Sequence, residues 1–508
     1  MSSSSLQKKF LSVKEKELVN EYQTGFIKHQ PMEKVGEKLA LSLFHQVAQR
    51  VPAYKKWLKK NKIDPTKIKN IKDFQSLPIV TKKNYLRAYP LNELCWDGKV
   101  SDLYILSSSS GSTGNPFLWP RGEEQELEGG LNFEVIFKEF FQADKYSTLL
   151  INSFSMGTWI AGPFVLACAE YLAKKGYPIL TVTPGLDKEV AFSLFKNLAE
   201  YFDQIVISGY PPYIKDILDT GKSHGINWSK YQIKLLFAAE GFSEKWREHV
   251  HEIIGAKDDF KTSINIYGSA DAAILSHETP VTTLIRKLVS ENFDSMKKVF
   301  GDNRIPTLTQ YDPRLKYFEV VNDSIIFTTR SGIPLIRYEI GDSGGVYSFQ
   351  AMDQKLSELG INLKDESRKF NLQNSLWRLP FVYVFGRSDF TVSFYGLLIY
   401  PEHIKYGLES DKYLKKFLTG KFVVSVEFDK DQDPYLMLRV ELLENVNPSE
   451  ILKEKVKRSV VKGLTKVNSE YTRLHEVLKD RALPVIELIK NSDNLYFRQG
   501  TKQKWVKK

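Results

Sequence analysis

The chain has 508 residues, 42% of them hydrophobic and 13% aromatic, so it is long enough to bury the cores of two or more domains. Its two cysteines exclude a disulfide framework and a cysteine-rich zinc site, and they fit a reducing compartment. The net charge of +11 comes from 72 basic and 61 acidic side chains that are spread through solvated segments, so we expect no nucleic-acid partner. The start, "MSSSSLQKKF", lacks the apolar region of a signal peptide and no later run is long enough for a transmembrane segment, which predicts a cytoplasmic protein.

From residue 148 the sequence predicts a regular alternation of strands and helices. Apolar strands are expected at 148–154, 177–185, 203–212, 233–241 and 262–270, and helices at 162–176, 187–202, 213–225 and 243–255. This alternation is typical of βαβ units, whose strands form a parallel sheet.

The predicted strands share a feature at their carboxyl ends. Each finishes in small or polar residues, which are Ser153 and Phe154, Thr183 to Gly185, Ser208 to Tyr210, Ala239 to Gly241, and Tyr267 to Ser269. Ligands of open α/β sheets bind beyond the carboxyl ends of the strands, so these residues outline one candidate pocket.

The pattern changes in the second half of the chain. Short strands within 316–349, separated by Asn-Asp, Ser-Gly and Gly-Asp turns, predict an antiparallel or barrel-like subdomain. The segment 351–375 is polar and predicts an exposed insertion. We therefore expect an α/β fold in which a large domain over residues 1–388, with mixed or parallel sheets, precedes a small α+β domain over residues 389–508.

A loop rich in hydroxyl groups follows an apolar run: residues 106–116 read "LSSSSGSTGNP". Its glycines permit a close approach of the backbone, and its hydroxyls and amides can donate to phosphate oxygens. A flexible linker is the simpler interpretation of this segment when it is taken alone. A Walker-type NTPase loop is excluded, because Gly114 is followed by Asn115 where that motif requires lysine.

Three further motifs are ambiguous one by one. "YGSADA" at 267–272 fits a core tyrosine followed by a helix N-cap as well as it fits a binding site. "RYEIGD" at 337–342 fits a hairpin turn, and "GRSD" at 386–389 fits an interdomain linker. Their joint occurrence, in this order, is what favours a function.

Together the motifs resemble the adenylate-forming superfamily of acyl-CoA synthetases, and within it the phenylacetate–CoA ligase family. The resemblance covers nearly the whole chain, through "SLPIVTKKNYLRAYP", "SSGSTGNP", "AAEGFSEKWR", "YGSAD", "GIPLIRYEIGD", "FGRSDF" and "GTKQKWV". It implies two half-reactions. A carboxylate first attacks the α-phosphate of ATP to give an acyl-adenylate and pyrophosphate, and a thiol, normally that of coenzyme A, then displaces AMP.

The resemblance also implies a nucleotide site. The loop would hold the leaving phosphates through Ser109, Ser110, Gly111, Ser112, Thr113 and Gly114. Tyr267 would stack on adenine, beside a group of pocket residues consisting of Ala239, Glu240, Gly241, Gly268 and Ser269. Asp342 would accept the ribose hydroxyls, with Arg387 as an additional donor, and Asp271 would hold Mg²⁺ where the family usually has glutamate.

Four positions in the last part of the chain are implied to work through domain movement. Asp389 resembles the hinge between the two half-reactions, and Lys502 resembles the lysine that bridges the carboxylate and the α-phosphate during adenylation. Lys504 competes with Lys502 for that role. Gly396 would let the pantetheine arm of coenzyme A pass.

The acid is expected to lie against "INSFSMGTWIAG" and Tyr210, with Phe154 and Trp159 as walls. Ordinary core packing explains these aromatic residues equally well. Some relatives carry a cysteine-rich zinc site after the tyrosine motif, but here that region supplies only His277, for which a structural role is expected.

The sequence therefore predicts an ATP-dependent acid–thiol ligase that uses ATP, Mg²⁺ and coenzyme A, with an aryl or other apolar acid favoured by analogy. Two alternatives stay open: transfer from the adenylate to an amine or a carrier protein, and a catalytically silent nucleotide-binding homologue. The expected partners are small molecules, and a homodimer is among the assemblies expected.

Overall fold

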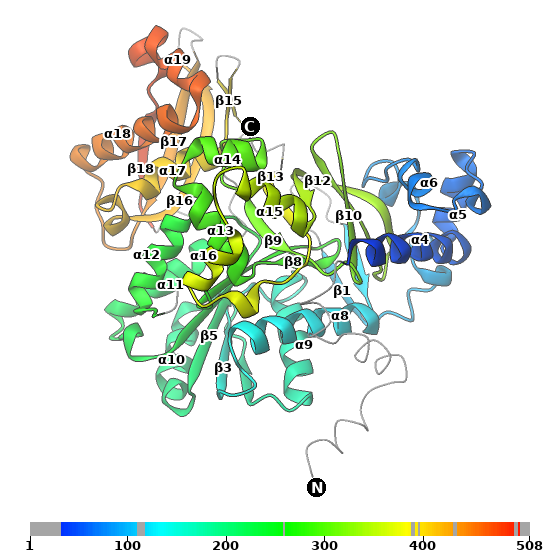
Figure 1. Cartoon of the computed structure of the whole chain (residues 1–508). Coiled ribbons are helices and arrows are strands. Elements are labelled where there is room, and N and C mark those ends of the chain that lie inside the picture. The colour runs from blue at the N-terminus through cyan, green and yellow to red at the C-terminus, as the bar shows by residue number, and fades with distance from the viewer. Residues whose placement is uncertain are drawn as a thin grey trace.

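The computed structural model describes residues 32–108, 117–257, 260–387, 392–394, 397–429, 434–491 and 496–497. Within these ranges, eleven strands form one mixed sheet in the order β10-β11-β12-β13-β9-β8-β7-β6-β5-β3-β4. In Figure 1 the N-terminal helices lie to the right of this sheet and the C-terminal elements lie at the upper left. The predicted fold class, α/β with a mixed sheet, is confirmed.

One half of the sheet is parallel, as the alternation predicts. Its strands are β3 (Thr148–Asn152), β4 (Ile179–Val182), β5 (Gln204–Gly209), β6 (Ile233–Ala238) and β7 (Ser263–Ser269). The connecting helices are α9 (Ala161–Lys174), α10 (Lys188–Leu198), α11 (Pro211–Ser223) and α12 (Glu244–Ile254). Strands β3 and β5 are buried along their whole length, which is typical of a parallel sheet covered on both faces.

The other half of the sheet is antiparallel. Its strands are β8 (Ala273–His277), β9 (Thr307–Gln310), β10 (Lys316–Val321), β11 (Ser324–Thr329), β12 (Leu335–Tyr347) and β13 (Phe381–Arg387). Strand β13 pairs with both β9 and β12, so the antiparallel strands expected in this region continue the large sheet and do not close as a separate barrel.

The polar segment 351–375 differs from the expected exposed insertion. It contains most of α15 (Phe349–Ser357) and all of α16 (Leu363–Lys369), which follow α13 (Pro280–Ser290) and α14 (Phe293–Phe300) in the same layer of packing. Met352, Leu356 and Leu363 are buried there. Met352 and Leu356 lie one helical turn apart, and such a narrow apolar stripe is easily hidden by a polar composition.

The N-terminal region is helical and ends in a two-stranded ribbon. Its helices are α4 (Glu33–Arg50), α5 (Pro52–Lys60), α6 (Ile71–Gln75) and α7 (Leu91–Leu94). The ribbon consists of β1 (Ile105–Ser108) and β2 (Leu118–Arg121), and it is followed by α8 (Glu123–Glu134) and the π-helical η4 (Val135–Phe140).

Short 3₁₀ turns connect the larger elements: η1 (Pro65–Lys67), η2 (Leu86–Ala88), η3 (Trp96–Gly98), η5 (Ala199–Tyr201), η6 (Trp228–Lys230) and η7 (Gln373–Ser375).

The C-terminal part has a sheet and a core of its own. It contains β14 (Val392–Phe394), β15 (Leu397–Ile399), α17 (Pro401–Ser410), η8 (Leu414–Lys416), β16 (Leu418–Phe428), β17 (Pro434–Leu442), α18 (Glu450–Val467), α19 (Ser469–Leu478), η9 (Lys479–Ala482) and β18 (Val485–Ile489). Strands β16, β17 and β18 form the sheet, and Phe422, Leu438 and Val456 belong to the core against it. The division into domains near residue 388 stays a prediction.

Both cysteines are buried and unpaired. Cys95 and Cys168 have 0% of their surface exposed. Burial raises the pKa of the Cys95 thiol to about 11 and raises the pKa of Cys168 well above its usual value. Among the helices in the described ranges, none has the length and hydropathy needed to cross a bilayer.

Candidate active site

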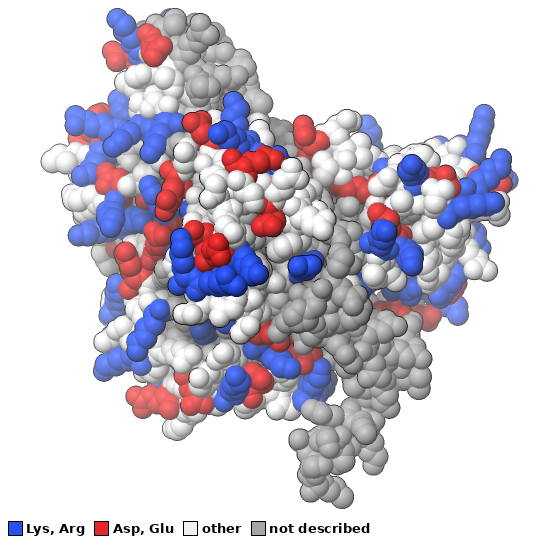
Figure 2. All heavy atoms as spheres, viewed as in Figure 1, with Lys and Arg blue, Asp and Glu red and all other residues white. Residues whose placement is uncertain are grey.

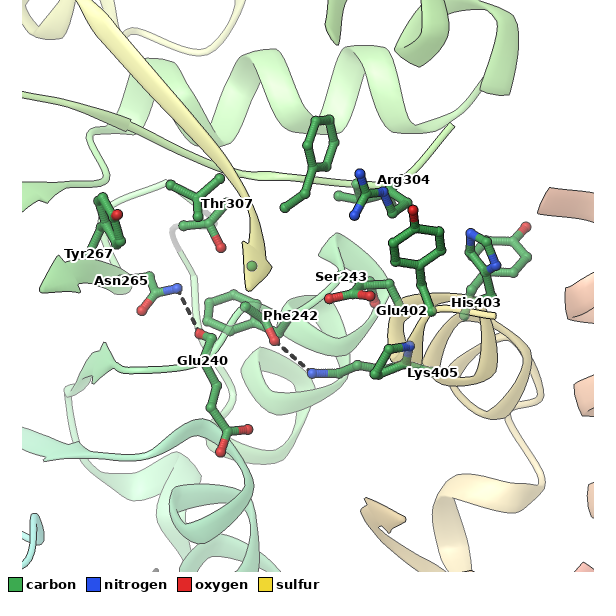
Figure 3. A pocket seen from close by; sticks show the side chains of 18 of the residues that line it. Glu240, Phe242, Ser243, Asn265, Tyr267, Arg304, Thr307, Glu402, His403 and Lys405 are labelled. Carbon is green, nitrogen blue, oxygen red and sulfur yellow. Dashed lines mark hydrogen bonds between the residues drawn. The ribbon is translucent and has the colours of Figure 1, made fainter. Parts of the chain in front are cut away.

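A cavity of about 210 Å³ lies beyond the carboxyl ends of β6 and β7, beside β12, β13 and the start of α17 (Figure 3). Its lining includes most of the residues that were expected to hold adenosine, namely Ala239, Glu240, Gly241, Tyr267, Gly268 and Asp342. The sheet thus brings together three motifs that lie far apart in the sequence.

Tyr267 and Asp342 are joined directly. The hydroxyl of Tyr267 donates to Oδ2 of Asp342 at 2.7 Å, although 75 residues separate them. Asp342 lies opposite Arg387 in the pairing of β12 with β13, so the register of the sheet also brings these two predicted residues to the same place. The side chain of Asp342 is therefore oriented by Tyr267 at the wall of the cavity.

The turn after β6 requires small residues. Ala239 has a φ of 74°, in the left-handed region that is rarely adopted by residues other than glycine. A Cβ atom on Gly241 would lie 2.8 Å from Oγ1 of Thr307, which also lines the cavity. The small residues at 239 and 241 let the backbone of the turn lie close to the cavity.

Asn265 is a site residue that the motif analysis missed. Its Nδ2 donates to the carbonyl oxygen of Glu240 at 3.1 Å, whereas its Oδ1 has no hydrogen-bond partner among the described residues. The side chain is only 1% exposed and lines the cavity (Figure 3). The signal was available, because Asn265 precedes Tyr267 by two positions in a strand and alternate residues share a face.

A buried network of ion pairs contacts the backbone of two residues that line the cavity, Asn265 and Phe242. Oε1 of Glu278 accepts from Arg247 at 2.7 Å and from Arg286 at 2.8 Å, and none of the three side chains is more than 1% exposed. Oε2 of Glu278 accepts the backbone N–H of Asn265 at 2.9 Å. Arg286 also donates to the carbonyl oxygen of Phe242, so the network contacts both the loop after β6 and strand β7 at Asn265.

Helix α17 forms the far side of the cavity. Tyr400, Glu402, His403 and Lys405 line it, and Nζ of Lys405 donates to the carbonyl oxygen of Gly241 at 2.7 Å (Figure 3). Burial raises the pKa of Glu402. Burial, and then the nearby positive charge of Arg304, lowers the pKa of His403 to about 4. These residues were not predicted, because sequence alone does not reveal where a helix docks 164 residues away.

Asp271, the expected magnesium ligand, contacts two other side chains, and its role with the metal stays a prediction. Its Oδ2 accepts the hydroxyl of Tyr338 at 2.6 Å and lies 3.3 Å from Nζ of Lys82. Neither Asp271 nor Ser269 is among the described residues that line the cavity, and Ser269 instead accepts the backbone N–H of Ala272 at 3.2 Å. The described ranges contain no cluster of three potential metal-ligating side chains.

The expected acid-binding aromatics lie beside the sheet, not in this cavity. Phe154 and Tyr210 pack edge to face with their ring centroids 5.0 Å apart, and both are buried. Burial raises the pKa of Tyr210. Trp159 is half-buried. Core packing accounts for the contact between Phe154 and Tyr210. That the three aromatic residues line an acid pocket stays a prediction.

Several predicted residues lie outside the described ranges: Ser109, Ser110, Gly111, Ser112, Thr113, Gly114, Asp389, Gly396, Lys502 and Lys504. The structure does describe the residue that precedes the predicted phosphate-binding loop. Ser108, at the end of β1, donates through its backbone N–H to the carbonyl oxygen of Thr158 at 2.8 Å and pairs with Leu118 across the ribbon. Strand β1 therefore ends beside Thr158 and pairs with β2, the strand that follows the predicted loop in sequence.

His277 has the structural role that the sequence predicts. It is 5% exposed, and its Nδ1 lies 2.7 Å from the carbonyl oxygen of Glu278. Burial lowers its pKa. The imidazole is therefore held as a neutral donor within the core.

Comparisons with known proteins place this geometry in context. No protein-family model matches the chain. A curated relative, the phenylacetate-coenzyme A ligase of Thermus thermophilus, is 23% identical over 302 residues, which cover 58% of this chain and 61% of that protein. The alignment thus spans less than two thirds of the relative's length.

Two solved structures of a 2-hydroxyisobutyryl-CoA ligase resemble the whole chain. The postadenylation state with R3-HIB-AMP has a TM-score of 0.65 at 16% identity, and covers 94% of this chain and 90% of that one. The open conformation with 2-HIB-AMP and CoA has a TM-score of 0.53 at 15% identity, and covers 95% and 93%. The chain therefore has the fold of the adenylate-forming acyl-CoA ligases, and the predicted resemblance to the phenylacetate–CoA ligases is confirmed.

Proposed function

We propose that this chain is an AMP-forming acid–thiol ligase, which activates a carboxylic acid as an acyl-adenylate and transfers the acyl group to coenzyme A. The observation that carries the proposal is the cavity in which the 239–241 turn, Tyr267 and Asp342 converge from separate motifs. A turn with small residues at 239 and 241, an aromatic ring and an oriented carboxylate suit the purine and the ribose of one nucleotide.

In this proposal the adenine ring lies between Tyr267 and the 239–241 turn. Oδ1 of Asn265, which is buried at the wall and has no hydrogen-bond partner among the described residues, accepts from the exocyclic amino group of adenine. Asp342 accepts from the ribose hydroxyls, since a carboxylate offers two acceptor oxygens. A guanine base would place a carbonyl oxygen against Oδ1 of Asn265, so ATP is preferred to GTP.

The first half-reaction breaks the bond between the α-phosphorus and the bridging oxygen of pyrophosphate. A carboxylate oxygen of the acid forms the new bond to the α-phosphorus, and pyrophosphate leaves. Residues 109–114 hold the leaving phosphates through hydroxyls and backbone amides. Lys502 or Lys504 contributes a positive charge where charge develops on the α-phosphate.

Magnesium is expected to accompany ATP, since Mg²⁺ is commonly held by one or two carboxylates together with substrate phosphates. The contacts of Asp271 with Lys82 and Tyr338 do not support this residue as the ligand, so no step is assigned to the metal. Lys82 instead balances the charge of a carboxylate that is 4% exposed.

The second half-reaction forms a thioester. The sulfur of coenzyme A attacks the acyl carbon, the bond from that carbon to the phosphate oxygen of AMP breaks, and the thiol proton is lost to solvent or a base. A rotation at Asp389 that brings Gly396 to the active site would admit the pantetheine arm. Phe154, Trp159 and Tyr210 are proposed to contact the acid, and their character favours an aryl or other apolar substrate.

A panel of carboxylic acids tests the proposal by acid-dependent exchange of labelled pyrophosphate into ATP. The panel should include phenylacetate and 2-hydroxyisobutyrate, and hits should then be assayed for thioester formation with coenzyme A. Exchange followed by thioester formation is expected. Exchange without thioester would favour an amine or a carrier protein as the acceptor, and AMP binding without any exchange would favour a silent homologue.

A further inference from the structure

Arg304 contacts two aromatic rings at the rim of the nucleotide cavity. Its Cζ is 4.3 Å from the ring centroid of Phe385 and 4.1 Å from that of Tyr400. Asp302 fixes the guanidinium, because its Oδ2 accepts from Nε at 2.9 Å and from Nη2 at 2.7 Å. The planar cation is thus held by a carboxylate and lies within cation–π distance of two rings, an arrangement that suits arginine and not lysine.

The two rings belong to different parts of the chain. Phe385 is in β13 of the large sheet, whereas Tyr400 immediately precedes α17. Helix α17 contributes Ile404 and Leu408 to the separate C-terminal core. The stack therefore joins the large sheet to the C-terminal part across residues 388–391.

Helix α17 contacts the cavity rim at two further points. Lys405 donates to the carbonyl oxygen of Gly241 at 2.7 Å, and Glu409, one turn later, accepts from the hydroxyl of Ser243. Gly241 belongs to the purine-lining turn and Ser243 follows it by two residues, and both line the cavity. The position of α17 and the shape of the nucleotide cavity are therefore linked by direct bonds.

We propose that Arg304 and Tyr400 are positioning residues, which form a latch that holds α17 against the nucleotide cavity and so sets how tightly nucleotide is retained. This inference rests on the proposed function for the identity of the ligand, a nucleoside monophosphate or triphosphate. Because coupling between two events is reciprocal, bound nucleotide stabilises the docked α17 and the docked helix slows release of the nucleotide.

The test compares variants of the full chain at the two members of the stack. Tyr400→Ala removes the ring, Tyr400→Phe keeps it, and Arg304→Lys keeps the charge without the planar group. Tyr413→Ala is the matched control, because Tyr413 lies 3.8 Å from Nζ of Lys455 in a cation–π contact confined to the C-terminal part. AMP is the probe for binding by calorimetry, and hydrogen exchange of residues 401–410 reports whether α17 is docked.

Tyr400→Ala and Arg304→Lys should weaken AMP binding by about 5- to 30-fold, the range expected for a partly desolvated cation–π contact. In the same variants the KM for ATP should rise while the KM for the acid stays the same. AMP should slow exchange in α17 of the unmodified chain and of Tyr400→Phe, but not in Tyr400→Ala.

Three results would overturn the latch. These are unchanged AMP affinity in Tyr400→Ala, an equal loss in Tyr413→Ala, and no binding of AMP to the unmodified chain. Failure of the proposed function looks different: no acid supports pyrophosphate exchange, yet AMP still protects α17, and the latch then stands for a nucleotide-binding protein without ligase activity.

Discussion

The hydroxyl of Tyr267 donates to Oδ2 of Asp342, so this carboxylate is oriented before any nucleotide arrives. Asp342→Ala should weaken ATP binding by roughly 2–4 kcal/mol, because the ribose hydroxyls lose a charged acceptor. Tyr267→Phe keeps the aromatic ring and the carboxylate, and its loss should be smaller. Calorimetry with ATP measures both effects.

A nucleotide without ribose hydroxyls provides the control for Asp342. The unmodified chain should bind 2′,3′-dideoxy-ATP more weakly than ATP, and Asp342→Ala should bind the two nucleotides with nearly equal affinity. If the variant still discriminates as the unmodified chain does, Asp342 does not contact the ribose and serves only to pair with Tyr267.

His403 makes stability depend on pH. Its pKa is lowered from 6.5 to about 4 by burial and then by Arg304, while Asp302 acts in the opposite direction. Between these two pH values the unfolded chain binds a proton that the folded chain does not, so stability falls as the pH falls from about 6.5 to about 4. The loss should amount to roughly 2–3 kcal/mol for this group.

His403→Gln should reduce that loss, because glutamine does not titrate. Urea unfolding at pH 7 and at pH 4.5 measures the difference for both proteins. An equal loss of stability in the variant and in the unmodified chain would assign the acid sensitivity to other groups, among them His249, whose pKa burial lowers to about 3.

At the scale of elements, the parallel half of the sheet was predictable and the docking of helix α17 was not. Strands such as β5 have a short apolar centre, Ile205 to Ile207, and their alternation with helices predicts them together with the small and polar residues at their ends. The contact of Lys405 with Gly241 depends on the packing of two separate cores, and no local pattern encodes it. Asn265 falls between these cases, because its place two positions before Tyr267 gave a signal that the motif alone did not carry.

The continuation of the sheet through β13 shows the same limit. Short strands with turn residues predict antiparallel hairpins, but the place of β13 between β9 and β12 is a long-range pairing. Asp271 marks another limit: its position in the motif suggests a metal ligand, but no local pattern predicts that Lys82 and Tyr338, from distant segments, contact its Oδ2.

The buried network at the junction of α12, β8 and α13 should be costly to break. Glu278→Gln leaves Arg247 and Arg286 with Glu244 as the one charged carboxylate they share, in a site that is 0% exposed at Glu278, so the free energy of unfolding should fall by about 3–5 kcal/mol. Glu248→Gln is the control on α12, since Glu248 is 52% exposed and lies 3.7 Å from Lys287. Urea unfolding compares the two variants. Equal losses of stability would contradict a special role for the buried ion network.

At the scale of the whole molecule, the excess of basic side chains that gives the net charge of +11 forms no single basic patch on the face seen in Figure 2. On the face seen in Figure 2, basic residues are interspersed with acidic ones. The fields of neighbouring opposite charges largely cancel at a distance. Salt also screens charges separated by more than a Debye length, which is about 8 Å at physiological ionic strength. On that face, attraction of an anionic nucleotide therefore depends on groups near the cavity more than on net charge.

The two half-reactions should respond oppositely to changes at the two ends of the C-terminal region. Lys502→Ala should slow acyl-adenylate formation by about 10²- to 10⁴-fold, yet leave thioester formation from a synthetic acyl-adenylate near its normal rate. Asp389→Pro should spare adenylation and block thioester formation, because a fixed φ opposes rotation. Rapid-quench assays measure each step, and a defect in Lys504→Ala alone would move the catalytic role to that residue.

Because both native thiols are buried, dyes can be attached selectively to introduced cysteines for distance measurements. Cys95 and Cys168 are its two cysteines and are inaccessible in the fold, so a maleimide should label neither in the native protein and both after unfolding. A donor and an acceptor dye could then be attached to new cysteines without removal of the two native ones. Suitable positions are Tyr201, which is 76% exposed beside the large sheet, and Ile451, which is 81% exposed on α18. The distance between the dyes, followed through a single turnover, would report in real time whether the two parts of the chain move between adenylation and acyl transfer.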